Sequence, residues 1–193
     1  WILYSSYKYF PKNTVFLCVV DPGVGSKRNC LAIKTKNYFF VGPDNGLMYK
    51  AASDDGILDV AALNEKNASK TFHGRDIFAK AAAQIDKSKK IDGKKSNVRV
   101  KLDFHLKGRK GEIVRIDRFG NIITNLTSLN KPSYLVKTKN FSKKLKFYRT
   151  YNETAYNKLF VIEGSSKTLE ISMKNSDASK KIKAKTGEKI EIL

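Results

Sequence analysis

The sequence has few of the features that mark disulfide-stapled, membrane-spanning or exported proteins. Its 193 residues include two cysteines, Cys18 and Cys30, which are too few for a disulfide framework. The longest apolar run, Val15 to Val20, is far shorter than the roughly 20 residues of a membrane-spanning helix. The first residues, WILYSSYKYF, lack a basic stretch followed by an apolar core, so we expect no signal peptide there. We therefore expect a cytoplasmic protein with no membrane partner.

Arginine is scarce in this chain although positive charge is abundant. Lysine and arginine number 38 against 18 acidic residues, which gives a formal net charge of +20. Such an excess raises the expectation of a polyanionic partner. Only seven of the 38 are arginine, however, the residue that makes most bidentate contacts to phosphates and bases. We favour a lysine-rich solvated surface. A basic nucleic-acid-binding module is kept as an alternative, because residues 81–193 carry 27 basic and 11 acidic residues.

The pattern of apolar residues changes along the chain, which predicts two domains. Residues 86–97, DKSKKIDGKKSN, lose all apolar periodicity and mark the boundary. We expect a partial α/β domain over residues 1–90 and an all-β, barrel-like domain over residues 91–193. In the first domain we expect the end of a helix within residues 1–10, a strand buried on both faces at Val15–Val20, strands at Cys30–Lys34 and Tyr38–Val41, and helices at Leu47–Ala52 and Asp76–Ile85. In the second we expect strands at Glu112–Ile116, Ile122–Leu126, Leu145–Tyr148, Leu159–Glu163, Thr168–Met173 and Lys189–Leu193.

The loop Asp21-Pro-Gly-Val-Gly-Ser-Lys-Arg28 follows the first expected strand. A carboxylate at the end of a buried strand has the usual place of ligand-binding residues in α/β sheets. Two glycines permit a tight turn, and Arg28 then returns a cation to the same end of the sheet. A turn closed by a salt bridge is the alternative. A dinucleotide-binding loop is excluded, because the third glycine is missing and a strand rather than a helix follows.

His73 lies in the segment Thr71-Phe-His-Gly-Arg-Asp76, at the start of an expected helix. This position predicts an exposed ring near the positive end of the helix dipole, where a neutral imidazole can accept a proton. A structural hydrogen-bond donor is the alternative. His105 is the only other histidine. Two isolated histidines without spaced cysteines predict no metal site.

A third motif, Asp117-Arg-Phe-Gly-Asn121, occupies the turn of an expected hairpin. Its carboxylate, aromatic ring and amide can bind an ammonium group, stack on a planar ring and pair with the edge of a heterocycle. An ordinary hairpin turn is the alternative.

Four segments, taken in order, resemble one family. They are VVDPGVGSKR, GPDNGL, TFHGRDIFAKAAA and DRFGNIITNL. They resemble segments of the S-adenosyl-L-methionine (SAM) hydroxide adenosyltransferases, which are adenosine-forming SAM hydrolases related to the fluorinases and chlorinases. The resemblance implies an α/β domain followed by a β-barrel-like domain. It also implies a homotrimer whose active sites lie between the N-terminal domain of one subunit and the C-terminal domain of the next.

The resemblance further implies a reaction in which water attacks the ribose C5′ of SAM and releases adenosine and L-methionine, with no metal and no cofactor. Asp21, Arg28 and His73 match the family's catalytic set, which favours water over halide as the nucleophile. The implied substrate contacts are Phe72 at the ribose, Asp117 at the ammonium group, Phe119 at the adenosyl portion, Asn121 and Tyr151 at adenine, and Ser165 and Ser166 at the methionine carboxylate.

The chain also departs from the family pattern. Family members begin with a strand and a Thr-Asp-Phe-Gly-type segment whose aspartate grips the ribose hydroxyls. No counterpart follows Trp1, so we expect an N-terminally incomplete chain. A truncated, non-catalytic protein that binds SAM or adenosine is therefore an alternative function.

Overall fold

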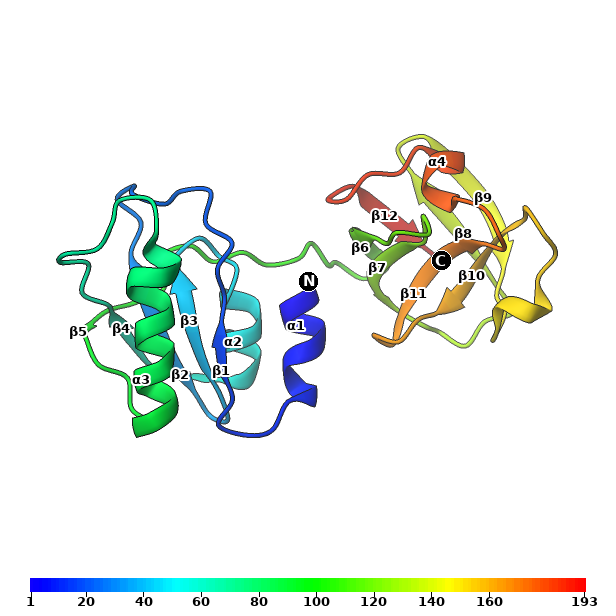
Figure 1. Cartoon of the computed structure of the whole chain (residues 1–193). Helices are drawn as coiled ribbons and strands as arrows, with labels where there is room; N and C mark the ends of the chain where they lie inside the picture. The colour runs from blue at the N-terminus through cyan, green and yellow to red at the C-terminus, as the bar shows by residue number, and fades with distance from the viewer. The chain divides into compact units, whose positions relative to one another are not determined.

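The computed structural model describes all 193 residues and divides into two compact units (Figure 1). The N-terminal unit comprises residues 2–103, and the C-terminal unit comprises residues 104–193 together with Trp1. Each unit has a sheet and a core of its own. No helix in either unit has the length and apolar character that crossing a membrane requires.

The N-terminal unit is built on a mixed five-stranded sheet of order β1-β3-β2-β4-β5. Only β1 and β3 run parallel, with Val15 opposite Phe39. The other neighbouring strands are antiparallel. The strands are β1 (Val15–Leu17), β2 (Cys30–Thr35), β3 (Phe39–Pro43), β4 (Ile57–Ala62) and β5 (Lys94–Lys95). The expected strands at Cys30 and Tyr38 are thus confirmed, whereas the α/β prediction holds only in part because the sheet is mixed.

Helices cover both faces of this sheet because the side chains of β2 and β3 alternate between two cores. Ile33 and Phe40 face a core that includes Ala51 of α2. Ala32 and Val41 face the other core, where Phe78 and Ile85 come from one helical segment. The helical segments are α1 (Ile2–Ser6), a 3-10 turn (Tyr7–Tyr9), α2 (Tyr49–Asp55), a π-helical turn (Gly74–Ala79) and α3 (Lys80–Ser88). The expected helices are therefore confirmed, and the one expected at Asp76 begins slightly earlier.

The prediction that Val15–Val20 forms a strand buried on both faces is wrong. Strand β1 ends at Leu17, and Val19 and Val20 are exposed. The physical reason is position, because β1 lies at the edge of the sheet with β3 as its one neighbour. An apolar run alone does not distinguish an edge strand from a central one.

The C-terminal unit is a seven-stranded antiparallel sheet of order β10-β11-β7-β6-β12-β8-β9. Its two edges meet where Phe147, just after β9, forms a bridge with Val161 of β10, so the sheet is nearly closed into a barrel. This confirms the barrel-like prediction. The strands are β6 (Lys110–Ile116), β7 (Ile122–Thr127), β8 (Ser133–Thr138), β9 (Phe141–Lys146), β10 (Leu159–Glu163), β11 (Thr168–Met173) and β12 (Lys189–Ile192).

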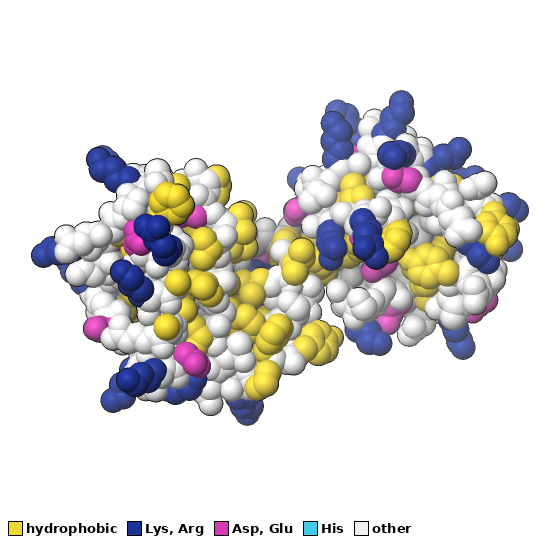
Figure 2. Space-filling view, in the orientation of Figure 1, with side chains coloured by type: hydrophobic (Ala, Val, Ile, Leu, Met, Phe, Trp, Pro, Cys, Tyr) yellow, Lys and Arg dark blue, Asp and Glu magenta, His cyan; other side chains and the backbone are white.

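The interior of this barrel-like sheet is filled by inward-facing side chains. Ile113, Ile122 and Ile171 come from three neighbouring strands and are fully buried. Helix α4 (Ala178–Ile182) adds Ala178 and Ile182 to the same core. The outward surface carries the excess lysine, and Figure 2 shows basic side chains spread over its visible face rather than gathered in one place. This distribution fits a solvated surface.

Candidate functional site

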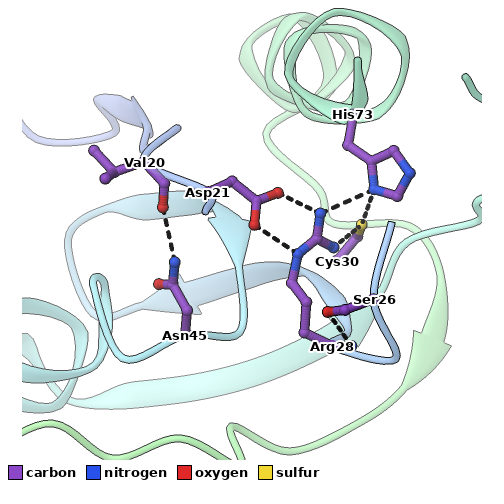
Figure 3. Close-up of polar contacts among 7 residues, drawn as sticks. All are labelled: Val20, Asp21, Ser26, Arg28, Cys30, Asn45 and His73. Atoms are coloured by element: carbon purple, nitrogen blue, oxygen red, sulfur yellow. Dashed lines mark hydrogen bonds and ion pairs between the residues drawn. The ribbon is translucent and has the colours of Figure 1, made fainter. Parts of the chain in front are cut away.

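Asp21, Arg28 and His73 form one continuous hydrogen-bonded chain in the N-terminal unit (Figure 3). The Arg28 guanidinium binds the Asp21 carboxylate through two nitrogens, with Nε 2.9 Å from Oδ1 and Nη2 in contact with Oδ2. Nη2 also lies 2.9 Å from His73 Nδ1. The Arg28 and Asp21 side chains are only 9% and 7% exposed. Arg28 therefore links the carboxylate to the imidazole in a site largely shielded from water.

Local backbone geometry explains how Asp21 and Arg28 meet. Asp21 follows the carboxyl end of β1, and Arg28 lies just before β2. Gly25, between them, has a φ of 77°, and a Cβ there would lie 2.7 Å from the Lys70 carbonyl oxygen. Glycine is required at such a position because a side chain has neither the conformational freedom nor the space. The sequence alternative of a turn closed by a salt bridge is therefore also correct as a description of this loop.

The segment GPDNGL, one of the four in the family resemblance, makes a hydrogen bond to the backbone of the same loop. Asn45 donates its side-chain amide to the carbonyl of Val20, the residue before Asp21, at 2.7 Å (Figure 3). The buried Asp44 accepts hydrogen bonds from the backbone N–H groups of Arg99 and Val100. The Asn45 hydrogen bond therefore holds the backbone next to Asp21 in place.

His73 reaches this site from the residue before the π-helical turn Gly74–Ala79. Asp76 anchors the preceding loop, because its carboxylate accepts hydrogen bonds from Arg75 Nε at 2.7 Å and from the Ser69 backbone N–H at 3.0 Å. The Arg75 hydrogen bond, followed by that of Ser69, lowers the Asp76 pKa to about 2. A Cβ at Gly74 would lie 3.0 Å from Val19, so the helix start packs closely on the segment that leads to Asp21.

The prediction that the His73 ring is exposed is wrong, because His73 is only 5% exposed. Its tautomer follows from its partner. Arginine can only donate, so His73 Nδ1 accepts from Arg28 and the ring proton of a neutral imidazole lies on Nε2. In this arrangement His73 offers a hydrogen-bond donor to a third group, rather than the proton acceptor expected from the sequence.

Cys30 and Glu65 lie beside this chain, and sequence reasoning missed both. Cys30 Sγ lies 2.9 Å from Arg28 Nη1 and 3.6 Å from His73 Nδ1. Burial raises the pKa of the Cys30 thiol to about 12, with Arg28 opposing the shift. One ligand atom each from Cys30, Glu65 and His73 lie within 4.8 Å of one another. The available signal was the i, i+2 spacing of Arg28 and Cys30, which places both on one side of the chain as it enters β2.

Burial also affects the pKa of Arg28, the central residue of the hydrogen-bonded chain Asp21–Arg28–His73. Loss of water alone would lower its pKa, but hydrogen bonds to Asp21 and Cys30 outweigh this effect and raise it. Its ring neighbour is Phe78, whose centroid lies 5.5 Å from the guanidinium carbon. Arg28 is therefore a permanent buried cation.

Phe72, by contrast, is 57% exposed, and the Arg75 guanidinium lies over its ring at 4.9 Å.

In the C-terminal unit the motif Asp117–Asn121 forms the turn between β6 and β7. The Asp117 carboxylate accepts from the backbone N–H groups of Phe119 and Asn121, and from the Asn121 side-chain amide at 2.9 Å. Asn121 is buried, whereas the Phe119 ring is 62% exposed. The motif therefore also forms the hairpin turn that was the alternative, and Phe119 lies exposed in this turn.

Tyr151, Ser165 and Ser166 lie on other parts of the same unit. The Tyr151 hydroxyl lies 3.2 Å from Ser172 Oγ, and burial raises the Tyr151 pKa, with smaller effects from Glu170 and Asp117. Ser165 and Ser166 lie in the turn between β10 and β11. This turn is next to Thr127, at the end of β7 opposite Asn121. The structure thus groups Tyr151 with Asp117, whereas the two serines lie further along the strands.

Glu170 is a second acidic group near Asp117 that the sequence did not indicate. It lies on β11 opposite Ile123, and its side chain covers Gly164, where a Cβ would lie 1.7 Å from a carboxylate oxygen. Burial and the nearby Asp117 raise the Glu170 pKa. The Arg115 charge opposes this shift, so two acidic groups and one cation interact in this part of the C-terminal unit.

These features define a class of protein: a mixed sheet covered by helices, a nearly closed antiparallel barrel-like sheet, and a buried carboxylate–guanidinium–imidazole chain at the end of the first strand. The chain belongs to the SAM hydroxide adenosyltransferase family. The family's N-terminal domain model matches residues 1–94, and its C-terminal domain model matches residues 111–191.

Curated relatives and solved structures agree with this assignment. A protein of Methanocaldococcus jannaschii named (R)-S-adenosyl-L-methionine hydrolase is 36% identical, over all of this chain and 76% of its own length. A protein of the same name from Thermus thermophilus is 30% identical, over all of this chain and 81% of its own length. The crystal structure of an uncharacterized conserved protein from Thermotoga maritima matches with a TM-score of 0.89 at 31% identity, covering the whole chain and 82% of that structure.

Proposed function

We propose that this protein hydrolyses SAM to adenosine and L-methionine. The observation that carries the proposal is the buried chain Asp21–Arg28–His73, found in a member of a family whose curated relatives are named (R)-S-adenosyl-L-methionine hydrolases. Water is the nucleophile and ribose C5′ is the carbon attacked. The C5′–S bond breaks, a new C5′–O bond forms, and the proton of the attacking water is released.

The chemistry places its demand on the nucleophile rather than on the leaving group. The sulfonium departs as a neutral thioether and needs no acid or Lewis-acid assistance. Water is a poor nucleophile because its pKa is about 15.7. A buried cation such as Arg28 stabilises developing hydroxide, and the Nε2–H of His73 can orient it. Acid–base and orienting effects of this kind contribute on the order of 10²–10⁴-fold in rate.

Asp21 has two roles in this proposal. Both of its oxygens bind Arg28, so it holds the guanidinium in one orientation. Its negative charge also balances the buried cation, and it can accept the proton that leaves the water. The three residues act together because Arg28 touches both of the others.

The C-terminal unit supplies most of the substrate contacts in this proposal. Its acidic groups, Asp117 and Glu170, suit the positive charge of SAM, whose sulfonium and ammonium groups are both cationic. The Phe119 ring is exposed, with the Arg118 guanidinium carbon 4.7 Å from its centroid, and it can cover a planar group. The proposed contacts are Phe72 at the ribose, Asp117 at the ammonium group, Phe119, Asn121 and Tyr151 at the adenosyl portion, and Ser165 and Ser166 at the carboxylate. The role of the two serines rests on the family resemblance alone, because they lie at the other end of β7 from Asn121.

We propose a homotrimer in which the N-terminal unit of one subunit and the C-terminal unit of another build each site. The proposal rests on the family resemblance and is tested by mixing two inactive variants. His73→Ala and Asp117→Ala proteins are each expected to be inactive, and their refolded mixture is expected to regain activity. A mixture that stays inactive, or a monomer by light scattering, contradicts this arrangement.

We also propose that the N-terminal unit is of the α/β class, that the protein is cytoplasmic and that it uses no cofactor. The parallel pair β1–β3 and the helices on both sheet faces support the first. The two free cysteines, Cys18 and Cys30, support the second, because thiols persist in a reducing compartment. A cofactor-free reaction follows from the neutral leaving group.

The activity is tested by incubating the protein with SAM and measuring both products. We expect adenosine and methionine in equal amounts from the wild type, and a loss of about 10²-fold or more in kcat for His73→Ala. His105→Ala is the matched control, since His105 is the other histidine and belongs to none of the four segments of the family resemblance. No product from the wild type, or equal rates for the two variants, contradicts the proposal.

A further inference from the structure

We propose that Cys30, Glu65 and His73 form a zinc(II) site whose occupation switches the enzyme off. The binding itself stands independently, whereas its effect on turnover rests on the proposed function. The three residues come from the start of β2, from the loop after β4 and from the start of the π-helical turn. Cys30 is 35 residues from Glu65 in sequence, and the fold brings it to the other two.

The distance between the two buried ligand atoms is that of a zinc site. Cys30 Sγ and His73 Nδ1 are 3.6 Å apart. A tetrahedral zinc ion with a sulfur at about 2.3 Å and a nitrogen at about 2.0–2.1 Å holds these atoms roughly 3.6 Å apart. The ion therefore needs little movement of either residue. Both are held by the surrounding fold, because Cys30 is 1% exposed and His73 is 5% exposed.

Glu65 completes the set from the surface side. It lies on an exposed loop, and its carboxylate is within 4.8 Å of both other ligand atoms. A flexible side chain closes this remaining distance by rotation. Thiolate, imidazole and carboxylate together are a zinc ligand set that leaves a fourth position for water. The thiolate selects zinc over magnesium or calcium, which prefer oxygen ligands.

His73 already has the protonation state that a metal ion needs, whereas Cys30 must first be deprotonated. His73 Nδ1 already carries a lone pair, because it accepts from Arg28. Binding requires that Cys30 lose its proton to solvent, so each zinc ion bound releases one proton. The thiolate and the Glu65 carboxylate then balance the two positive charges of the ion.

Zinc and the catalytic arrangement exclude each other. The lone pair of His73 Nδ1 binds either Arg28 Nη2 or the metal, and Arg28 Nη1 now contacts the same sulfur that the metal needs. A divalent cation at this place also repels the guanidinium. Zinc therefore separates Arg28 from His73, breaks the chain that activates water and inhibits hydrolysis.

Cobalt(II) spectroscopy and zinc calorimetry on tag-free protein test the site. We expect one cobalt per chain, with tetrahedral d–d bands and a thiolate-to-cobalt charge-transfer band. The Cys30→Ala variant should lose the charge-transfer band and about tenfold or more in zinc affinity, and Glu65→Gln should weaken binding by a smaller factor. Cys18→Ala is the matched control, since Cys18 is also a buried free cysteine with a pKa raised by burial to about 12.

The inhibition is measured separately, with each variant normalised to its own rate in the presence of a chelator. Zinc should inhibit the wild type and Cys18→Ala alike, and Cys30→Ala should need about tenfold or more zinc for the same inhibition. No charge-transfer band, or equal zinc affinity in Cys30→Ala and Cys18→Ala, overturns the site. Zinc binding in a protein that releases no adenosine instead retains the site and overturns the proposed function.

Discussion

Arg28 binds its neighbours through three nitrogens of one planar group. Nε and Nη2 hold Asp21, Nη2 also meets His73, and Nη1 reaches Cys30. A guanidinium has this fork geometry and stays charged when buried, whereas an ammonium group is a single point charge. The site therefore depends on arginine itself and not on positive charge alone.

The Arg28→Lys variant tests this dependence at the residue scale. Lysine keeps the charge but cannot contact the carboxylate and the imidazole together, so kcat should fall by about 10²-fold or more. Steady-state kinetics with SAM measure the effect. Arg149→Lys on the exposed surface is the control and should keep wild-type kinetics. Equal kcat for the two variants would show that Arg28 acts only through its charge.

Two loops, one after β1 and one after β4, hold the residues of the site in place. The first carries Asp21 to Arg28 around Gly25, which lies against the Lys70 carbonyl of the second loop. Asp76, in the π-helical turn after the second loop, accepts from the Ser69 backbone N–H and so ties that loop to the helix start beside His73. Neither loop has a core of its own, so these close contacts and hydrogen bonds set their geometry.

Replacing Gly25 by alanine tests the contact between the loops. The strained φ and the clash with the Lys70 carbonyl should together lower the free energy of unfolding by about 1–3 kcal/mol and reduce activity. Gly108→Ala is the control, because Gly108 also has a positive φ, 59°, but a Cβ there meets nothing within 4 Å. Urea unfolding measures both variants. Equal losses in the two would mean that the clash contributes nothing.

The low pKa of Asp76 predicts how the second loop responds to acid. A carboxylate whose pKa is about 2 in the folded state, against 3.8 ordinarily, stabilises the fold above about pH 4. This contribution is lost as the pH falls towards 2. The difference in free energy of unfolding between wild type and Asp76→Asn should therefore shrink over this range. A constant difference for Asp76→Asn would contradict the assignment.

At the scale of the whole molecule, the two units have separate cores. The core of the C-terminal unit, including Ile122, Leu169 and Ile171, draws its residues from residues 113–192 alone. The strand pairing in that unit is also internal. Each unit therefore satisfies the main requirements of an independently folding domain.

The fragment of residues 104–193 should accordingly fold by itself. We expect β-type circular dichroism and one cooperative thermal transition. Ile171→Ala should lower the free energy of unfolding of the fragment by about 2–5 kcal/mol, because Ile171 is fully buried. A fragment without a cooperative transition would show that the C-terminal unit depends on the N-terminal unit.

Sequence reasoning anticipated those parts of the fold that local pattern determines. The strands at Leu159–Glu163 and Thr168–Met173 have the predicted bounds, since alternation and a turn fix both ends. Strand β8 was missed, because its alternating apolar residues are mixed with lysine and serine. The position of β1 at the sheet edge was missed because strand order depends on pairing between distant segments.

In the site, too, sequence reasoning anticipated what local sequence determines and missed what depends on contacts between distant segments. The Asp21–Arg28 pair follows from a short loop and was anticipated as a salt bridge. The link to His73 came from the family resemblance, and its buried ring did not follow from a position at a helix start. Cys30 and Glu65 were missed, because their approach to His73 depends on the packing of β2 and of the loop after β4 against one helix start.

In the proposed reaction, water activated beside Asp21, Arg28 and His73 attacks ribose C5′. Hydrolysis in ¹⁸O-labelled water, followed by mass spectrometry of both products, shows which bond is broken and where the oxygen of water goes. The proposal predicts one ¹⁸O atom in adenosine, at the 5′ oxygen, and none in methionine. Release of unlabelled adenosine, or of a label in methionine, would contradict it.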